Sequence, residues 1–347
     1  METFLNELGR QTLFRISEPS EIAAARRAGN ELGRKLGFDE TRTGQLAILI
    51  TEASTNILKH AEHGEILLRP VVCIGADGVE INGVEVTALD AGPGMINVSM
   101  QMTDGQSSAG TYGVGLGAIK RLAQELDIYS RPNLGTVLVM LIWSNPAELP
   151  AQRWEIGAVC LPLPSEDICG DSWRVAPFLT GVALMMADGL GHGPDAAAAS
   201  QSAVAVVNGE PDSLPARMLE RAHLAGRGSR GSAAAAARID CGSDELRYCG
   251  VGNIAGCIYT ANGRQHLLSH NGIVGSNIRK VQEFVYPWQA DAMLILHSDG
   301  LSTRWELSQY PGLADCHPSV IAAVLYRDFC RKRDDATVLV LREKRGD

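Results

Sequence analysis

Aspartates follow apolar segments at four places in the second half of the chain. Strands ending there would bring Asp171, Asp188, Asp299 and Asp334 to one edge of a sheet. Four carboxylates at short range repel one another unless cations neutralise them, and oxygen ligands suit Mg²⁺ or Mn²⁺. The second half therefore predicts a metal-dependent hydrolase. The motifs are Cys-Gly-Asp-Ser at 169–172, Met-Ala-Asp-Gly-Leu-Gly-His-Gly at 186–193, His-Ser-Asp-Gly-Leu at 297–301 and Asp-Asp-Ala-Thr at 334–337.

A second set of polar residues lies in the first half, within residues 46–61. Glu52, Asn56, Lys59 and His60 occupy positions i, i+4, i+7 and i+8, which is the spacing of one helix face. The opposite face is apolar. The pattern predicts an amphipathic helix that displays a carboxylate, an amide, an amine and an imidazole together.

Two glycine motifs follow this predicted helix. Leu-Asp-Ala-Gly-Pro-Gly-Met at 89–95 comes directly after a strand-like segment, and Gly-Val-Gly-Leu-Gly at 113–117 opens an amphipathic stretch at 118–126. Glycines at a helix start let backbone N–H groups and the helix dipole meet phosphate oxygens. One such motif is weak support by itself, but the polar helix and both motifs in this order indicate a phosphate-binding domain.

Simpler interpretations exist for single residues. An Asp-Gly pair is most often a turn, so the metal site depends on all four motifs occurring together. Lys59 is as readily a solvated helix lysine as a phosphate contact. His60 and His63 have no metal-ligand partner at suitable spacing, and we interpret them as structural or exposed. His192 lies between glycines, where a turn residue is more common than a proton donor.

The composition of the chain argues against several functional classes, namely nucleic-acid-binding, membrane-spanning and zinc-binding proteins. The net charge of −9 gives no basic surface of the kind that nucleic-acid binding needs. No signal peptide and no apolar stretch of membrane-spanning length is present, so we expect a cytoplasmic location. The eight cysteines contain no Cys-x-x-Cys pair, which argues against zinc. We expect Cys241, Cys249 and Cys257 to be reduced and buried.

The chain separates into two domains near residue 148. Its 347 residues suffice for about two domains of ordinary size, and the polar stretch 144–153 contains two prolines. We assign residues 1–145 to an N-terminal domain, 146–153 to a linker and 154–347 to a C-terminal domain. The fold class is α+β, with an α/β sandwich followed by a β-sandwich flanked by helices.

Local patterns place the elements. In the first domain we expect helices at 19–36, capped by Ser17 or Ser20, at 41–61 and at 118–126. Strands at 65–74, 83–89, 127–130 and 136–142 complete it. In the second domain short strands dominate, with helices near 194–208, 212–226 and 317–331. The alanine run 233–237 favours helix by propensity, but its neighbours suggest a hairpin, so we assign it to a strand.

The first domain resembles the GHKL ATPase family, and within it the small RsbT/RsbW type of serine kinase. The matching stretches are 51–61, 90–95, 113–126 and Gly135-Thr136, and a segment at 104–108 favours the RsbT side. The resemblance implies that Asp90 contacts adenine, Asn56 binds Mg²⁺ and Glu52 is the general base. The residues that it places around ATP and Mg²⁺ are Glu52, Asn56, Lys59, Asp90, Gly92, Gly94, Gly113, Gly115, Gly117 and Thr136. The stretch 96–112 is either a lid over the nucleotide or a plain surface loop.

Residues 154–343 resemble the metal-dependent PPM serine/threonine phosphatases of the RsbX/SpoIIE type. The matches are Gly170-Asp171, 187–193, 250–254, Ser298-Asp-Gly300 and Asp334-Asp335. The resemblance implies that Asp188 bridges two Mn²⁺ or Mg²⁺ ions, assisted by the backbone carbonyl of Gly189. It also implies that Asp299 and Asp334 complete the shell of one ion and that Asp171 holds metal-bound waters. Many SpoIIE-type enzymes have a further aspartate where this chain has Trp173-Arg174-Val175, which puts the occupancy of the second metal in doubt.

Together the two resemblances imply opposed activities on one chain. The kinase half would phosphorylate, and the phosphatase half dephosphorylate, STAS-domain antagonist proteins of a stressosome-like pathway. The alternative is that the first half only binds ATP and a partner, such as a sigma-factor regulator, while the phosphatase turns over. Some GHKL relatives dimerise, so a homodimer is compatible with the resemblance.

Overall fold

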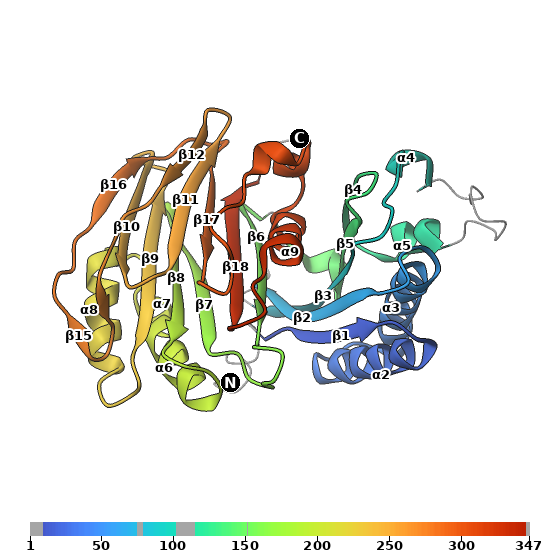
Figure 1. Ribbon diagram of the computed structural model, residues 1–347, viewed down its shortest axis with the longest axis horizontal. Coiled ribbons are helices and arrows are strands. Elements are labelled where there is room, and N and C mark those ends of the chain that lie inside the picture. The colour runs from blue at the N-terminus through green and yellow to red at the C-terminus, as the bar shows by residue number, and fades with distance from the viewer. Residues whose placement is uncertain (1–9, 75–78, 102–114, 151, 345–347) are drawn as a thin grey trace. The chain divides into compact units, whose positions relative to one another are not determined.

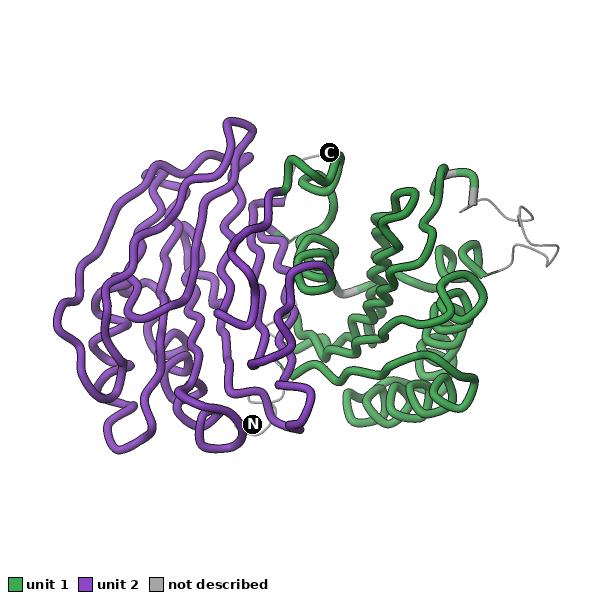
Figure 2. Tube along the Cα trace, viewed as in Figure 1, with its two compact units in different colours: residues 1–152, 307–327 green, residues 153–306, 328–347 purple. Residues whose placement is uncertain are grey.

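The computed structural model describes residues 10–74, 79–101, 115–150 and 152–344. The chain forms two compact units, which are coloured separately in Figure 2. Unit 1 contains residues 1–152 and 307–327, and unit 2 contains residues 153–306 and 328–347. Our sequence-based boundary assigned the segment 307–327 to the second domain, whereas its contacts group it with the first unit. Gly113 and most of the stretch 96–112 lie outside the described residues.

Unit 1 is built on one antiparallel sheet of five strands in the order β1-β2-β3-β5-β4. Four strands agree with the sequence pattern, and β1, which pairs at the edge with β2, was not predicted. The strands are β1 (Thr12–Ile16), β2 (Gly64–Ile74), β3 (Glu80–Asp90), β4 (Glu125–Ser130) and β5 (Thr136–Trp143).

Helices cover one face of this sheet, as Figure 1 shows for α2 (Pro19–Lys35) and α3 (Glu40–His60). The apolar face of α3, including Leu46 and Ile50, packs on Val84 and Val86 of β3. The remaining elements are α4 (Val98–Gln101), α5 (Gly115–Leu122) and η1 (Pro146–Glu148). The predicted helix at 118–126 therefore begins and ends earlier, because Glu125 already belongs to strand β4.

The start of α2 differs from our expectation of a serine cap. The N-cap residue is Glu18, and the backbone N–H of Glu18 donates to Oε2 of Glu21 at 3.0 Å. The hydroxyl of Ser17 also donates to this carboxylate, at 2.9 Å. The prediction of Ser17 or Ser20 as the cap was wrong because the acidic side chain three residues into the helix reaches back and satisfies the free N–H groups.

The segment 307–327 belongs to the opposite face of the unit 1 sheet. It contains η2 (Leu307–Gln309), η3 (Leu313–Asp315) and nearly all of α9 (Pro318–Phe329). Side chains alternate across a strand, so Glu85 points away from the helices that pack on Val84 and Val86. The hydroxyl of Ser319 in α9 donates to Oε2 of Glu85 at 2.6 Å, which places α9 on this second face.

Unit 2 is a sandwich of two mainly antiparallel sheets (Figure 1). One sheet has the order β13-β10-β9-β8-β7, with β16 paired to β10, and the other has the order β12-β11-β17-β18-β6. Its strands are β6 (Trp154–Leu161), β7 (Asp171–Phe178), β8 (Gly181–Gly189), β9 (Ser232–Asp240), β10 (Glu245–Val251), β11 (Ala255–Thr260), β12 (Gly263–His266), β13 (Ser269–His270), β14 (Gly272–Ile273), β15 (Asn277–Ile278), β16 (Phe284–Pro287), β17 (Met293–His297) and β18 (Ala336–Glu343).

The core of unit 2 lies between the sheets, where Leu184 and Met186 share a cluster with Leu294 and Leu339. On the outer face of the first sheet pack α6 (Pro194–Val204), α7 (Val206–Gly209) and α8 (Pro215–Ala225). The predicted helix at 194–208 is thus two helices that meet at Ala205.

The alanine run confirms the strand assignment. Ala233, Ala235 and Ala237 face the core between the sheets, while Ala234 and Ala236 face the helices. All five are buried, and their small side chains let helices and the second sheet approach β9 closely. Tertiary packing therefore overrides the helix propensity of alanine here. Among the described helices, none is long and apolar enough to cross a membrane.

Candidate functional site

The polar face of α3 meets the first turn of α5. Glu52 and Asn56 are half-buried, whereas Lys59 and His60 at the end of α3 are exposed. A Cβ atom added at Gly115 would lie 3.1 Å from Oε2 of Glu52 and 3.3 Å from Oδ1 of Asn56. The structure thus brings together a carboxylate, an amide and a glycine-rich helix start. Gly117, which follows Gly115 in the same turn of α5, is buried.

Asp90 ends strand β3 and receives backbone hydrogen bonds. Its Oδ1 accepts from the N–H of Gly92 at 2.8 Å and from the N–H of Thr136 at 3.2 Å. Burial raises the pKa of Asp90, while these two N–H groups and the charge of Arg327 act in the opposite direction. The side chain is therefore held in one orientation at the edge of the sheet.

Two glycines allow the chain to close around Asp90. Gly94 has φ +67°, and a Cβ atom there would lie 2.0 Å from the carbonyl oxygen of Arg131. Gly135 has φ +70°, and its Cβ would lie 2.1 Å from the carbonyl oxygen of Asp90. Both positions combine a left-handed backbone with contact too close for a side chain. The glycines at 92–94 and 135 therefore shape the loops that flank Asp90 and Thr136.

In unit 2, four predicted aspartates end or begin neighbouring strands. Asp171 begins β7 and Asp188 lies near the end of β8, and the two are directly opposite in the antiparallel register. Asp299 follows β17 and Asp334 precedes β18, which pair with each other. The sheets therefore bring these carboxylates toward one end of the sandwich, as the motif positions predicted.

Burial and mutual repulsion raise the pKa values of this acidic cluster. Burial raises the pKa of Asp188 to about 9, and the nearby carboxylates of Asp171, Asp299, Asp334 and Asp335 add to the increase. Burial likewise raises the pKa of Asp171 to about 7. The hydroxyls of Ser298 and Thr337 lie close enough to Asp171 to oppose this increase, although within the described residues neither buried carboxylate oxygen makes a hydrogen bond of good geometry. The mutual repulsion of these carboxylates is the feature that a bound divalent cation would remove.

The carboxylates line one end of the sandwich without forming a closed cage. In the part of the chain that the structure describes, no three acidic, imidazole or thiol groups converge closely enough to enclose an ion. Magnesium commonly keeps several water ligands and uses only one or two carboxylates. The donor set of Asp171, Asp188, Asp299, Asp334 and the carbonyl of Gly189 fits such an ion in its chemistry.

Asp335 and Asn253 are site residues whose roles sequence reasoning missed. Oδ1 of Asp335 accepts from the N–H of Leu163, and Oδ2 accepts from the N–H of Gly170, both at 2.8 Å. Asp335 thereby holds the loop that leads into Asp171. Asn253 donates to Oδ2 of Asp299 at 2.8 Å. The Asp-Asp pair at 334–335 and the Gly-Asn at 252–253 were visible signals, but they do not reveal which oxygen bonds to which N–H.

His192 pairs with a carboxylate. Its Nδ1 lies 2.6 Å from Oε1 of Glu166, and 57% of its side-chain surface is exposed. Burial raises the pKa of Asp335, and the charge of His192 is among the influences that oppose this increase. The imidazole therefore lies within electrostatic reach of the acidic cluster. The pairing holds the ring in place.

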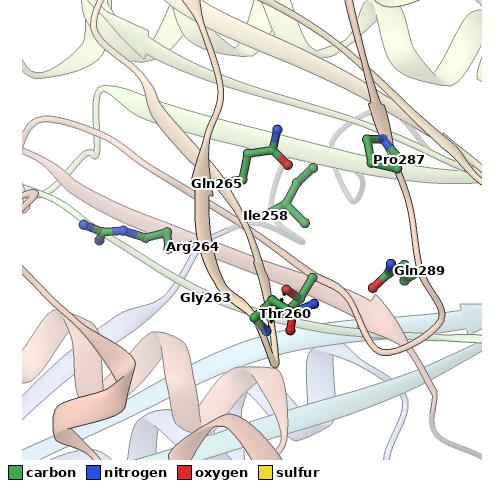
Figure 3. A pocket seen from close by; sticks show the side chains of 8 residues that line it. Ile258, Thr260, Gly263, Arg264, Gln265, Pro287 and Gln289 are labelled. Carbon is green, nitrogen blue, oxygen red and sulfur yellow. Dashed lines mark hydrogen bonds between the residues drawn. The ribbon is translucent and has the colours of Figure 1, made fainter.

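A shallow hollow lies elsewhere in unit 2 (Figure 3). It surrounds the hairpin that joins β11 to β12, at the opposite end of β11 from Asn253. Arg264 points away from it and donates to the carbonyl of Trp305 at 2.7 Å. None of the predicted site residues contributes to it. The lining residues are Ile258, Thr260, Asn262, Gly263, Arg264, Gln265, Pro287 and Gln289.

Comparison with known proteins identifies both parts. Residues 16–142 match the family described as histidine kinase-like ATPase domain, and residues 180–344 match the family described as stage II sporulation protein E (SpoIIE). The chain is 32% identical over 133 residues to the serine/threonine-protein kinase RsbT of Bacillus subtilis (strain 168). This alignment covers 38% of the chain and 96% of RsbT. The chain belongs to the RsbT-type family of histidine kinase-like ATPases.

In this RsbT-type chain the ATPase domain is fused to a SpoIIE-type PPM domain, which confirms the predicted combination. A solved structure described as "The bacterial stressosome: a modular system that has been adapted to control secondary messenger signaling" is 28% identical, with a TM-score of 0.52. It covers 55% of the chain and 100% of that structure's chain. The solved structure of RsbX in complex with magnesium is 21% identical, with a TM-score of 0.51. The match covers 56% of this chain and 98% of the RsbX chain, and it supports the α+β fold.

Proposed function

We propose that the protein is a bifunctional, cytoplasmic regulator of a partner-switching pathway. Its first half would phosphorylate serine or threonine on STAS-domain proteins, and its second half would remove phosphate from such proteins. The observation that carries the proposal is the 32% identity to the kinase RsbT across 96% of the length of RsbT, joined in one chain to a SpoIIE domain.

For the kinase half, the arrangement of α3 and α5 supports ATP binding. Glu52 would accept the proton of the incoming hydroxyl, and Asn56 would hold the magnesium ion, with Lys59 nearby. The start of α5 at Gly115 and Gly117, together with Gly113, would receive the phosphates. Asp90, held by Gly92 and Thr136 and flanked by Gly94, would contact adenine. Bound magnesium would neutralise phosphate charge.

For the phosphatase half, the acidic cluster supports metal-dependent hydrolysis. Asp188 would bridge two Mn²⁺ or Mg²⁺ ions, assisted by the carbonyl of Gly189. Asp299 and Asp334 would complete the shell of one ion, and Asp171 would hold metal-bound waters. The cations would supply charge neutralisation and an acidified water as nucleophile. Asp335 and Asn253 would orient Asp171 and Asp299 through the hydrogen bonds described above.

The test uses two single-site variants and one purified STAS-domain protein as substrate. With ATP and Mn²⁺, the Asp188→Ala variant should phosphorylate the STAS protein, because its phosphatase half is disabled. The Glu52→Ala variant, added afterwards, should remove that phosphate. Mass spectrometry of the STAS protein measures both steps.

Each outcome has a defined meaning. Phosphate transfer by the Glu52→Ala variant would contradict the assignment of the base, and phosphate removal by the Asp188→Ala variant would contradict the bridging role. If the Asp188→Ala variant transfers no phosphate while the Glu52→Ala variant dephosphorylates a phosphorylated STAS protein, the alternative is favoured. In that case the first half binds ATP and a partner, such as a sigma-factor regulator, without kinase activity.

A further inference from the structure

The segment 307–327 lies between strands β17 and β18 in the sequence, yet it belongs to the compact unit of the ATPase domain. We propose that this segment is a working part of the nucleotide-binding domain, and that Arg327 is a positioning residue for Asp90. The proposal rests on the proposed function, because Asp90 is assigned there to adenine. It assigns to a stretch of the phosphatase half a role in the kinase half.

The first support is a buried charge network on the second face of the sheet. Arg69 and Glu85 form a two-point ion pair, with Nε to Oε1 at 3.0 Å and Nη2 to Oε2 at 2.8 Å. Their side chains are only 5% and 4% exposed. Ser319 of α9 donates to the same Oε2 of Glu85 at 2.6 Å. Removing two charges from water costs free energy, and the ion pair compensates for it only when the remaining lone pairs of the carboxylate also accept hydrogen bonds. Ser319 provides one such bond.

Apolar burial agrees with this placement. Leu67, Leu89 and Val137 occupy the same second face by strand alternation and are at most 3% exposed. Every residue of α9 from Pro318 to Tyr326 is buried. A helix that is buried on all sides is part of a core. The second face of the ATPase sheet is therefore a packed interior and not a free surface.

The decisive contact is at the nucleotide edge. Nη1 of Arg327 donates to the backbone carbonyl of Asp90 at 3.0 Å. Burial raises the pKa of the Asp90 carboxyl, and the positive charge of Arg327 opposes that increase. The same residue thus holds the backbone of Asp90 and favours its ionised form. An ionised carboxylate accepts hydrogen bonds more strongly than a neutral acid, which is what recognition of an amino group requires.

Further contacts tie the segment to the loop beside Gly94. Nη2 of Arg131 donates to the carbonyl of Pro311 at 2.6 Å, and the carbonyl of Arg131 lies against Gly94. The N–H of His317 donates to Oδ2 of Asp127, and the rings of Tyr129 and Tyr310 are 6.5 Å apart. The segment therefore holds β4, its following loop and the end of β3, which together frame Asp90.

The test measures ATP affinity and stability in the full-length protein. The variants are Arg327→Gln, Arg327→Lys and Ser319→Ala, with exposed Arg27→Ala as a matched control. We expect Arg327→Gln to raise the dissociation constant of a fluorescent ATP analogue with Mg²⁺ about tenfold, equal to about 1.4 kcal/mol, with little change in melting temperature. Arg327→Lys should recover most of the affinity, because it keeps a cationic donor.

Ser319→Ala separates positioning from general stability. It should lower the melting temperature and leave the ATP affinity within about twofold, whereas Arg27→Ala should change neither. Wild-type affinity in Arg327→Gln would overturn the proposal. Equal losses of ATP affinity in Ser319→Ala and Arg327→Gln would also overturn it, since both would then reflect loosened packing.

Hydrogen exchange keeps the inference separate from the proposed function. Without nucleotide, Arg327→Gln should increase amide exchange in the peptide spanning 84–92, and Arg27→Ala should not. If the unaltered protein fails to bind ATP, the proposed function fails. Faster exchange at 84–92 would then still support Arg327 as the residue that holds Asp90, and unchanged exchange would overturn that as well.

Discussion

Replacing Glu85 with Gln should destabilise unit 1 strongly. The substitution keeps the shape of the side chain but leaves the guanidinium of Arg69 buried without its counter-charge. The side chain of Arg69 is 5% exposed, so water cannot take the place of the Glu85 carboxylate. Breaking a buried ion pair from one side costs about 3–5 kcal/mol, and we expect a loss in this range for the unfolding of the sheet.

The assay is urea unfolding followed by circular dichroism, with the transition of unit 1 assigned by amide exchange in β3. A matched surface control is Glu31→Gln. Glu31 pairs with Lys35 at 3.3 Å, and both side chains are 65% exposed. Such a pair contributes about 0.3–0.5 kcal/mol at most. The double variant Arg69→Met with Glu85→Leu should recover most of the lost stability, because apolar replacements of similar volume remove both charges together.

The pH dependence has a defined sign. Burial raises the pKa of Glu85. The charge and hydrogen bonds of Arg69 and the hydrogen bond from Ser319 lower this pKa by more than burial raises it, so the net pKa lies below 4.5. When folding lowers the pKa of a group, that group stabilises the folded state at pH values above its pKa in the unfolded chain. This stabilisation is lost as the pH falls through the folded-state pKa. The difference in unfolding free energy between wild type and Glu85→Gln should therefore be largest near pH 7 and should shrink below about pH 4.5. A difference under about 1 kcal/mol at pH 7, or one that grows on acidification, would refute the reasoning.

Three further predictions concern the two sites. In Asp335→Asn an NH2 donor replaces one of the two oxygens that accept from the N–H groups of Leu163 and Gly170. Mn²⁺-dependent hydrolysis of p-nitrophenyl phosphate should therefore require at least about tenfold more Mn²⁺. Activity at the wild-type Mn²⁺ concentration would contradict this. Gly94→Ala should abolish ATP-analogue binding, because its Cβ would lie 2.0 Å from the carbonyl of Arg131; retained affinity in a titration would contradict the described loop. Mn²⁺ at about 100 times its dissociation constant should stabilise the wild type by about 2.7 kcal/mol and leave Asp188→Ala nearly unchanged, as measured by thermal unfolding with and without a chelator.

Local sequence patterns were sufficient for much of the fold. The spacing of Glu52 and Asn56 predicted the amphipathic helix α3, and the strand-like patterns at 65–74 and 136–142 predicted β2 and β5. The alanine run at 233–237 was predicted correctly only because its flanking residues outweighed propensity. The start of α2 was predicted correctly but its cap was not, because the side chain of Glu21 reaches back from the first turn. Strand β1 was missed because its pairing with β2 is a long-range contact.

The sequence by itself identified the candidate site residues, because motif order and residue type are local properties of the chain. Asp171, Asp188, Asp299 and Asp334 could be named without coordinates. The hydrogen bonds of Asp335 and the inclusion of residues 307–327 in unit 1 could not. These depend on contacts between segments far apart in the chain, such as Arg327 with Asp90. Only tertiary packing decides such contacts, because no local periodicity records which distant carbonyl a buried guanidinium will meet.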